Sequence, residues 1–97
     1  MKKIICNTPK GQFSIPLQLI AEHRADYYAV VVDGHEKNSP EWNSEVRFVM
    51  EDDYEAIDWL LNNTDWVEWK DHATKLNEKV MVTDEDFWRR SDDFTIE

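Results

Sequence analysis

The three histidines and the single cysteine of this chain are spaced too widely to suggest a metal site. His23, His35 and His72 have no second histidine or cysteine three or four residues away or across a two-residue gap, the spacings typical of zinc sites. The spaced acids, glycine and distal glutamate of a calcium loop are also missing. Cys6 has no basic neighbour closer than Lys3, so the sequence predicts a buried, inert thiol. We therefore expect no metal and no cofactor.

The serines and carboxylates lack the settings that enzymes need. No serine lies in a nucleophile elbow or a triad motif, and the two glycines are isolated, so a Gly-rich phosphate loop is excluded. Adjacent acids such as Asp52 and Asp53 do not face each other across a cleft, as glycoside hydrolysis requires. Two acids distant in sequence that meet in the fold, and a small-molecule pocket, stay open. The sequence favours a protein that is not an enzyme.

Negative charge is the most unusual property of the sequence. The 97 residues include 21 acidic and 11 basic side chains, for a net charge of −10. Residues 51–71 hold eight of the acids and one base. Such a charge disfavours direct binding to nucleic acid and to anionic membranes, and it attracts basic protein surfaces. Acidity that only keeps the protein soluble is the alternative.

Acidic and aromatic side chains alternate in residues 51–71 and suggest a partner-binding surface. Acids three or four residues apart lie side by side on a helix and would form a negative ridge. Trp59 lies outside the apolar face expected for this helix, so its indole is expected to be exposed. An exposed indole beside acids is frequent in protein interfaces. The alternatives are tryptophans that build the core and a solvated acidic helix face. Asp58 and Trp59 are the first expected contacts, and the full predicted set is Glu51, Glu55, Asp58, Trp59, Asp65 and Glu68.

Apolar spacing and turn residues predict the elements of the first half. Residues 2–15 are typical of a β-hairpin, because a dense turn signal separates two short apolar runs. A helix is expected over residues 16–32, with Ser14 as its cap and an end at Gly34, and a strand that starts in the β-branched run 30–32 is the alternative for its last residues. A second helix is expected to begin at Ser39 and Pro40, with a strand over residues 46–49 as the alternative.

The second half is expected to contain two or three more helices and one strand. Asp52 or Asp53 caps a helix that ends near Leu61, and one further helical turn follows up to residue 69. Residues 79–82 are typical of a strand, and a short helix is expected from Thr83. Beyond residue 90 the tail is polar, so we expect residues 91–97 to fray. Tyr54, Ile57, Leu60 and Leu61 are the predicted apolar face of the helix that Asp52 or Asp53 begins.

These elements predict a single small α+β domain over residues 1–97. The hairpin and the late strand would form a short antiparallel sheet packed against three to four helices. No apolar run approaches the roughly 18 residues needed to span a bilayer, and the N-terminal apolar stretch is too short for a signal peptide. A single cysteine cannot form an internal disulfide. We therefore expect a cytoplasmic protein that does not bind membranes.

Residues 15–29 (IPLQLIAEHRADYYA) and 53–66 (DYEAIDWLLNNTDW), about a third of the chain, resemble small acidic proteins of unassigned role that tailed bacteriophages encode. The resemblance implies a phage or prophage origin, and hence the host-cell cytoplasm, and it carries no functional residues. Small acidic phage proteins often bind and block a host protein, including defence nucleases. The expected function is therefore a non-enzymatic protein-binding module, an inhibitor of a host or anti-phage defence protein that docks into a basic groove in place of nucleic acid. The alternative is a structural protein that assembles into a homo-oligomer and has no inhibitory role.

Overall fold

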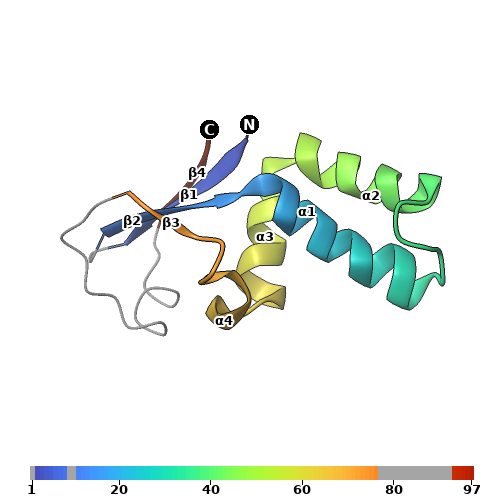
Figure 1. The fold of residues 1–97 in the computed structure, drawn as a ribbon. Coiled ribbons are helices and arrows are strands. Elements are labelled where there is room, and N and C mark those ends of the chain that lie inside the picture. Colours follow the sequence, from blue (N-terminus) through green and yellow to red (C-terminus); the bar gives the residue numbers. More distant parts are fainter. Residues whose placement is uncertain (1, 9–10, 77–92) are drawn as a thin grey trace.

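The fold is α+β, as predicted: a four-stranded antiparallel sheet and a layer of helices (Figure 1). The computed structural model describes residues 2–8, 11–76 and 93–97. The predicted strand over residues 79–82 and the predicted helix from Thr83 lie outside the described residues. The described elements are β1 (Lys3–Thr8), β2 (Gly11–Pro16), α1 (Leu17–Ala25), η1, a π-helix (Asp26–Val32), α2 (Pro40–Glu51), α3 (Asp53–Asn63), α4 (Trp66–Trp69), β3 (Thr74–Lys75) and β4 (Asp93–Ile96).

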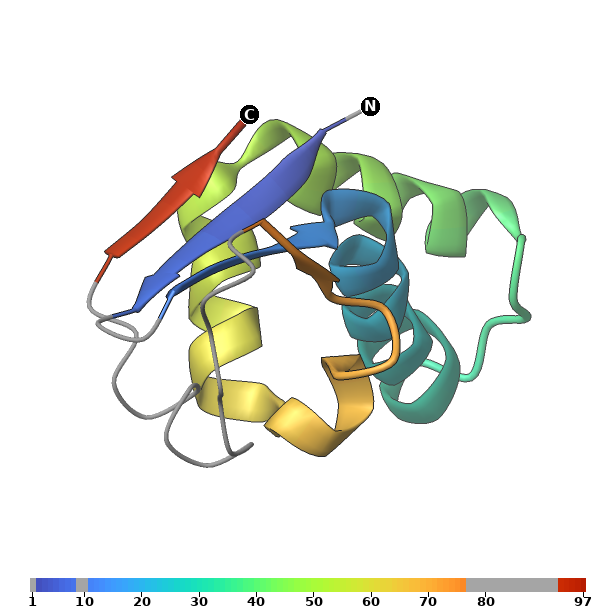
Figure 2. The ribbon, with the colours of Figure 1, turned by 60° about the vertical axis from the view of Figure 1, so that its left-hand side comes forward.

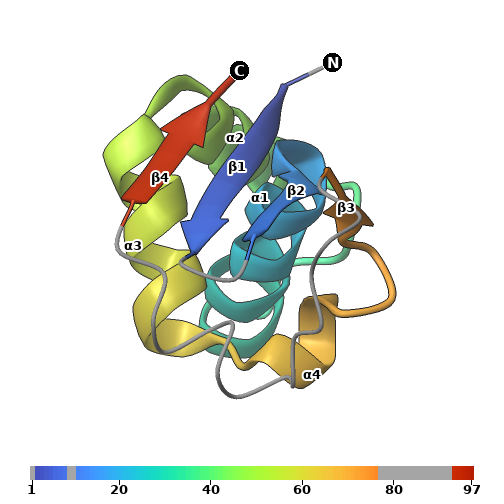
Figure 3. The same cartoon turned by 90° about the vertical axis from the view of Figure 1, so that its left-hand side faces the viewer.

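The strands lie in the order β3-β2-β1-β4, and Figure 3 looks onto this sheet with the helices behind it. The predicted hairpin is confirmed: β1 and β2 pair with Ile4 opposite Ile15 and Cys6 opposite Phe13. The expectation that residues 91–97 fray is wrong for β4, because it pairs with β1 along residues 93–96. In addition, the backbones of Lys3 and Glu97 exchange two hydrogen bonds of 2.8 and 3.0 Å.

The core lies between one face of the sheet and the helices, which Figure 2 shows on the same side of the strands. Residues that alternate along a strand point to the same face, so each strand sends every second side chain into this core. Phe94 and Ile96 of β4 follow that alternation and pack against the core, which explains why the polar tail is ordered there. The sheet contributes the buried residues Ile4, Cys6, Phe13 and Ile15, and the helices contribute Leu17, Ile20, Ala21, Ala25, Ala29, Trp42, Val46, Val49, Ala56, Trp59, Leu60 and Trp69.

The expected helix over residues 16–32 is confirmed, although Ser14 does not cap it. Ser14 lies within β2 and is buried there. Helix α1 follows β2 directly at Leu17, and the Leu17 N–H donates to the carbonyl oxygen of Lys2 at 3.1 Å. One of the free N–H groups of the first turn is thus satisfied by the backbone of Lys2, directly before β1, rather than by a side-chain cap.

From Asp26 the helix widens into the π-helix η1. The Asp33 N–H donates to the carbonyl oxygen of Tyr28, five residues back, at 3.1 Å, as the π pattern requires. The His35 N–H donates to the carbonyl oxygen of Ala29 at 2.7 Å, and Gly34 takes the left-handed φ of 76° that ends the helix. The buried side of α1 and η1 runs through Ala21, Ala25 and Ala29, and α2 packs along it.

The helices after η1 begin at the caps that the sequence predicts. Ser39 accepts a hydrogen bond from the Trp42 N–H at 3.2 Å, and Asp52 accepts one from the Glu55 N–H at 3.2 Å. Residues 46–49 are therefore helical, and the strand alternative is wrong. The additional turn after residue 64 is confirmed as α4. Within the described part of the chain, no helix has the length and apolar character needed to cross a membrane.

Candidate interaction face

Trp59, the aromatic contact predicted from the sequence, belongs to the core. Its side chain is only 5% exposed, whereas Tyr54, expected on the apolar face, is 73% exposed. The indole N–H of Trp59 donates to His23 Nδ1 at 2.9 Å, so its polar atom is satisfied within the molecule. The expected apolar face of α3 is therefore rotated: Ala56, Trp59 and Leu60 are buried. An indole with an internal partner can be buried without cost to its N–H group.

The other described tryptophan side chains are also internal. Trp42 is buried and donates its indole N–H to Asp26 Oδ1 at 2.8 Å. Trp69 is buried and donates to Thr64 Oγ1 at 2.8 Å, while Thr64 donates to the carbonyl oxygen of Leu60. For these residues the core interpretation of the tryptophans is confirmed, and they do not form a contact surface.

The predicted acids of α2 and α3 differ in their exposure and in whether they have a partner within the molecule. Glu51 is exposed at the end of α2, one residue before the cap of α3. Asp58 accepts a hydrogen bond from Asn62 Nδ2 at 2.8 Å on the surface of α3. Glu55 is partly buried, and its carboxylate lies 3.8 Å from the Arg24 guanidinium. The structure thus places these three acids on two helices, and one of them faces a cation of the chain itself.

The predicted acids of α4, Asp65 and Glu68, stabilise the start of that helix. The Asp65 N–H donates to Glu68 Oε2 at 2.8 Å, which is the backward half of a capping box. The second oxygen of Glu68 lies 3.2 Å from His23 Nε2. Because His23 Nδ1 accepts the hydrogen bond of Trp59, the imidazole hydrogen sits on Nε2 and points at Glu68. Both acids are exposed, but Glu68 has partners within the molecule.

Arg24 is the centre of a cluster that sequence reasoning missed. Its guanidinium donates to Glu45 Oε2 at 2.9 Å, in addition to the longer contact with Glu55. It lies over the ring of Tyr28, 4.6 Å from the centroid, and over that of Phe48, 5.3 Å from the centroid. The Arg24 side chain is only 14% exposed. One cation therefore joins α1, η1, α2 and α3 and fixes two aromatic rings at the surface.

Several large apolar side chains remain exposed around this cluster. Tyr28 and Phe48 are 37% and 47% exposed, respectively. Tyr27, Val31 and Val32 are exposed on the same π-helix. The sequence held a signal for this surface, because six bulky or apolar residues in succession cannot all share the buried side of one helix. We define the aromatic face as Tyr27, Tyr28 and Phe48, because Tyr27 packs against Tyr28 and the Arg24 guanidinium lies over both Tyr28 and Phe48.

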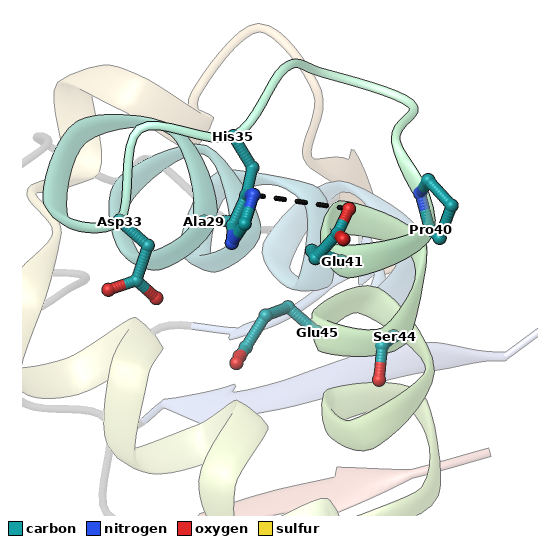
Figure 4. A pocket seen from close by; sticks show the side chains of 7 residues that line it. All are labelled: Ala29, Asp33, His35, Pro40, Glu41, Ser44 and Glu45. Atoms are coloured by element: carbon teal, nitrogen blue, oxygen red, sulfur yellow. Dashed lines mark ion pairs between the residues drawn. The ribbon is translucent and has the colours of Figure 1, made fainter.

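A pocket of about 400 Å³ opens between η1 and α2 (Figure 4). Asp33 lies on one wall, Glu41 and Glu45 lie on the other, and Ala29 forms part of the floor. His35 approaches Glu41 to 4.0 Å, between its Nδ1 atom and the carboxylate. Since Glu45 also binds Arg24, the pocket adjoins the aromatic cluster. Its walls are acidic, a feature that the sequence alone did not reveal because its residues come from three segments.

Cys6, the single cysteine of the sequence, is buried and forms no disulfide. Burial raises the pKa of the Cys6 thiol from 9.0 to about 12, which keeps it protonated and unreactive near neutral pH. Over residues 2–8, 11–76 and 93–97, no three side chains of the kinds that bind metals are gathered into a group that could hold an ion. Comparisons with protein-family models, with curated proteins and with solved structures found no match for this chain.

Proposed function

We propose that this chain is a non-enzymatic protein-binding module that recognises a basic surface of its partner. One observation carries the proposal: residues 40–63, which form α2 and α3, contain seven acidic side chains and a single basic one. The acids Glu41, Glu51 and Asp53 are exposed there. A layer of one sign accelerates association with oppositely charged proteins and disfavours other partners.

The binding surface differs from the one expected from the sequence. The proposed surface does not include Trp59, because that side chain is buried. It includes the exposed aromatic residues Tyr28 and Phe48 instead. The acids Glu51, Asp58 and Asp65 stay in the proposed surface. The resemblance to phage-encoded proteins makes a host or anti-phage defence protein with a nucleic-acid groove the first class of partner to test.

Charge reversal tests this function. In the variant Glu51→Lys/Asp58→Lys, the binding of a candidate basic host protein is expected to weaken at low salt, and added salt should weaken wild-type binding as well. The control Glu36→Lys/Asp71→Lys changes the net charge equally, at exposed positions in the loop after η1 and the turn after α4. Equal losses in both variants would mean that net charge alone acts, and unchanged binding in the first variant would reject the proposal.

The second candidate function is self-assembly through the aromatic face. The exposure of Tyr27, Tyr28 and Phe48 favours it, because apolar side chains clustered on a surface often mark an interface. Light scattering over a range of protein concentrations separates the two: a monomer at every concentration rejects assembly, whereas an oligomer that Phe48→Ser dissociates supports it.

A further inference from the structure

The face formed by η1 and α2 has two chemically different ends. At one end Tyr28 and Phe48 flank the Arg24 guanidinium and present aromatic surface to the solvent. At the other end lies the acidic pocket with Asp33 and Glu41 on opposite walls (Figure 4). We call this surface, with its aromatic end and its acidic end, the η1–α2 face.

The charges at the acidic end are incompletely neutralised by the chain. Glu45 is occupied by Arg24, but Asp33 has no ion-pair partner among the described residues. Within the same described part of the chain, Glu41 forms an ion pair only with His35, at 4.0 Å. The nearby Lys37 lies over the ring of Trp42, 5.9 Å from its centroid. A cationic side chain of a partner would therefore find two acids in a pocket large enough to hold it.

The distance between the two ends of the face sets the spacing that the contacting side chains of a partner should have. Phe48 and Glu41 lie seven residues apart on α2, which corresponds to about 10 Å along the helix axis. A partner helix that lies along α2 has the same rise per residue. It would match both ends if a large apolar side chain and an arginine or lysine were also seven residues apart on one of its faces.

We propose that the η1–α2 face binds an amphipathic helix of a basic partner protein, with an apolar side chain on Tyr28 and Phe48 and a cationic side chain in the pocket beside Glu41. Charge complementarity and the arrangement of an aromatic end and an acidic end along α2 favour such a helix as the partner. This inference rests on the proposed function and deepens it, because it selects one part of the acidic layer and one kind of partner structure.

Two synthetic peptides of identical composition test the proposal. Each has about 18 residues, long enough to populate a helix, and carries leucines and arginines. In the first peptide a leucine and an arginine seven residues apart share one face; in the second the arginine is moved to the opposite face. Titrations followed by amide NMR shifts are expected to show tighter binding of the first peptide, with shifts concentrated in η1 and α2.

Matched variants locate the contact. Phe48→Ser is expected to weaken binding of the first peptide about tenfold, in the range of an interface hot spot. Glu41→Gln should weaken it at low salt and have no effect at high salt, because it removes one exposed charge. The controls Tyr54→Ser and Asp71→Asn alter an exposed aromatic residue and an exposed acid that lie outside both the η1–α2 face and the proposed acidic surface, and they should bind as the wild type does. Circular dichroism checks that each variant folds.

Other results of the peptide and variant experiments would reject the η1–α2 face as the binding site or the helix as its occupant. Equal binding of both peptides, or larger losses in the control variants, would reject the η1–α2 face as the site. Shifts confined to α3 and α4 would do the same while leaving an acidic protein-binding function in place. If the face instead mediates contact with a second copy, Phe48→Ser would dissociate an oligomer seen by light scattering, and the peptide occupant would be rejected.

Discussion

Removing the guanidinium of Arg24 should destabilise the whole helical layer. The variant Arg24→Met keeps the apolar stem of the side chain and deletes the charge that joins Glu45, Glu55, Tyr28 and Phe48. The two glutamates would then face each other without a cation. The loss therefore includes both the missing contacts and the repulsion that remains, which is the unfavourable way to break a partly buried ion pair.

The magnitude follows from the contacts. A hydrogen bond to a charged group contributes about 1.5–3 kcal/mol when shielded from water, and the 2.9 Å contact with Glu45 is of this kind. Glu45 is itself 36% exposed, so the lower end of that range applies. Each ring contact adds about 0.5–1 kcal/mol. We expect Arg24→Met to lower the free energy of unfolding by about 2.5–3.5 kcal/mol.

Urea denaturation followed by circular dichroism measures this change. The control Arg47→Met removes the other arginine of the helical layer, which is exposed on α2, and should change the free energy of unfolding by less than about 0.5 kcal/mol. A double-mutant cycle with Glu45→Gln should give a coupling of about 1 kcal/mol between the two side chains. If Arg24→Met were no worse than Arg47→Met, the reasoning that makes Arg24 the centre of this cluster would be refuted.

Three further predictions concern the cap of α2, the buried thiol and the histidine beside Trp59. Ser39→Ala removes the hydrogen bond to the Trp42 N–H and should lower the free energy of unfolding by about 1 kcal/mol, whereas Ser39→Asp should retain it; equal denaturation curves for Ser39→Ala and the wild type would contradict this. Because burial raises the pKa of Cys6 from 9.0 to about 12, the unfolded chain releases the thiol proton first, and the wild type should lose stability relative to Cys6→Ala as the pH rises above 9.0. The slope should be about 1.4 kcal/mol per pH unit in urea denaturation, and parallel pH profiles of the two proteins would disprove it. His23→Phe would leave the buried Trp59 N–H without its acceptor, so the free energy of unfolding should fall by about 1–3 kcal/mol in urea denaturation, and a curve equal to that of the wild type would overturn this expectation.

The features that depend on neighbouring residues in sequence were predictable. The Ser39 cap and the Asp52 cap each join a side chain to a backbone N–H three residues further on, and the hairpin joins two strands that are consecutive in sequence. Local rules for turns and caps cover that distance. The same applies to the additional turn α4.

The sequence could not predict which side of α3 is buried, because that depends on a contact with a residue far away in the sequence. Ranked by hydrophobicity and spacing, Tyr54 and Leu61 fit an apolar stripe with Ile57 and Leu60. In the fold, His23 accepts the indole hydrogen of Trp59 from 36 residues away and makes burial of that large ring favourable. The β4 strand was missed for a similar reason, since its pairing with β1 outweighs the polar composition around Phe94 and Ile96.

The sequence predicted the negative charge of the candidate surface, but it did not predict where on the fold that surface lies. The excess of acids in the middle of the chain is visible in the composition, and it led to the acidic ridge. The position of Arg24 between Glu45 and Glu55 requires the crossing of three helices, so no pattern of spacing reveals which acids are neutralised. The exposed rings of Tyr28 and Phe48 result from the same crossing.

The wide turns of η1 also give this helix room for one additional residue. A π-helix accommodates one more residue than an α-helix over the same span, and one residue corresponds to a rotation of about 100° around the axis of an ordinary helix. Deleting a single residue within Asp26–Val32 would let this segment close into regular α-helical turns. Asp33 and Gly34 would then keep their position around the helix axis, because the deleted residue is the one that the wider turns accommodate. A length change of one residue at this point would therefore alter which side chains the segment itself exposes, while leaving the alanine-lined seam with α2 largely in place.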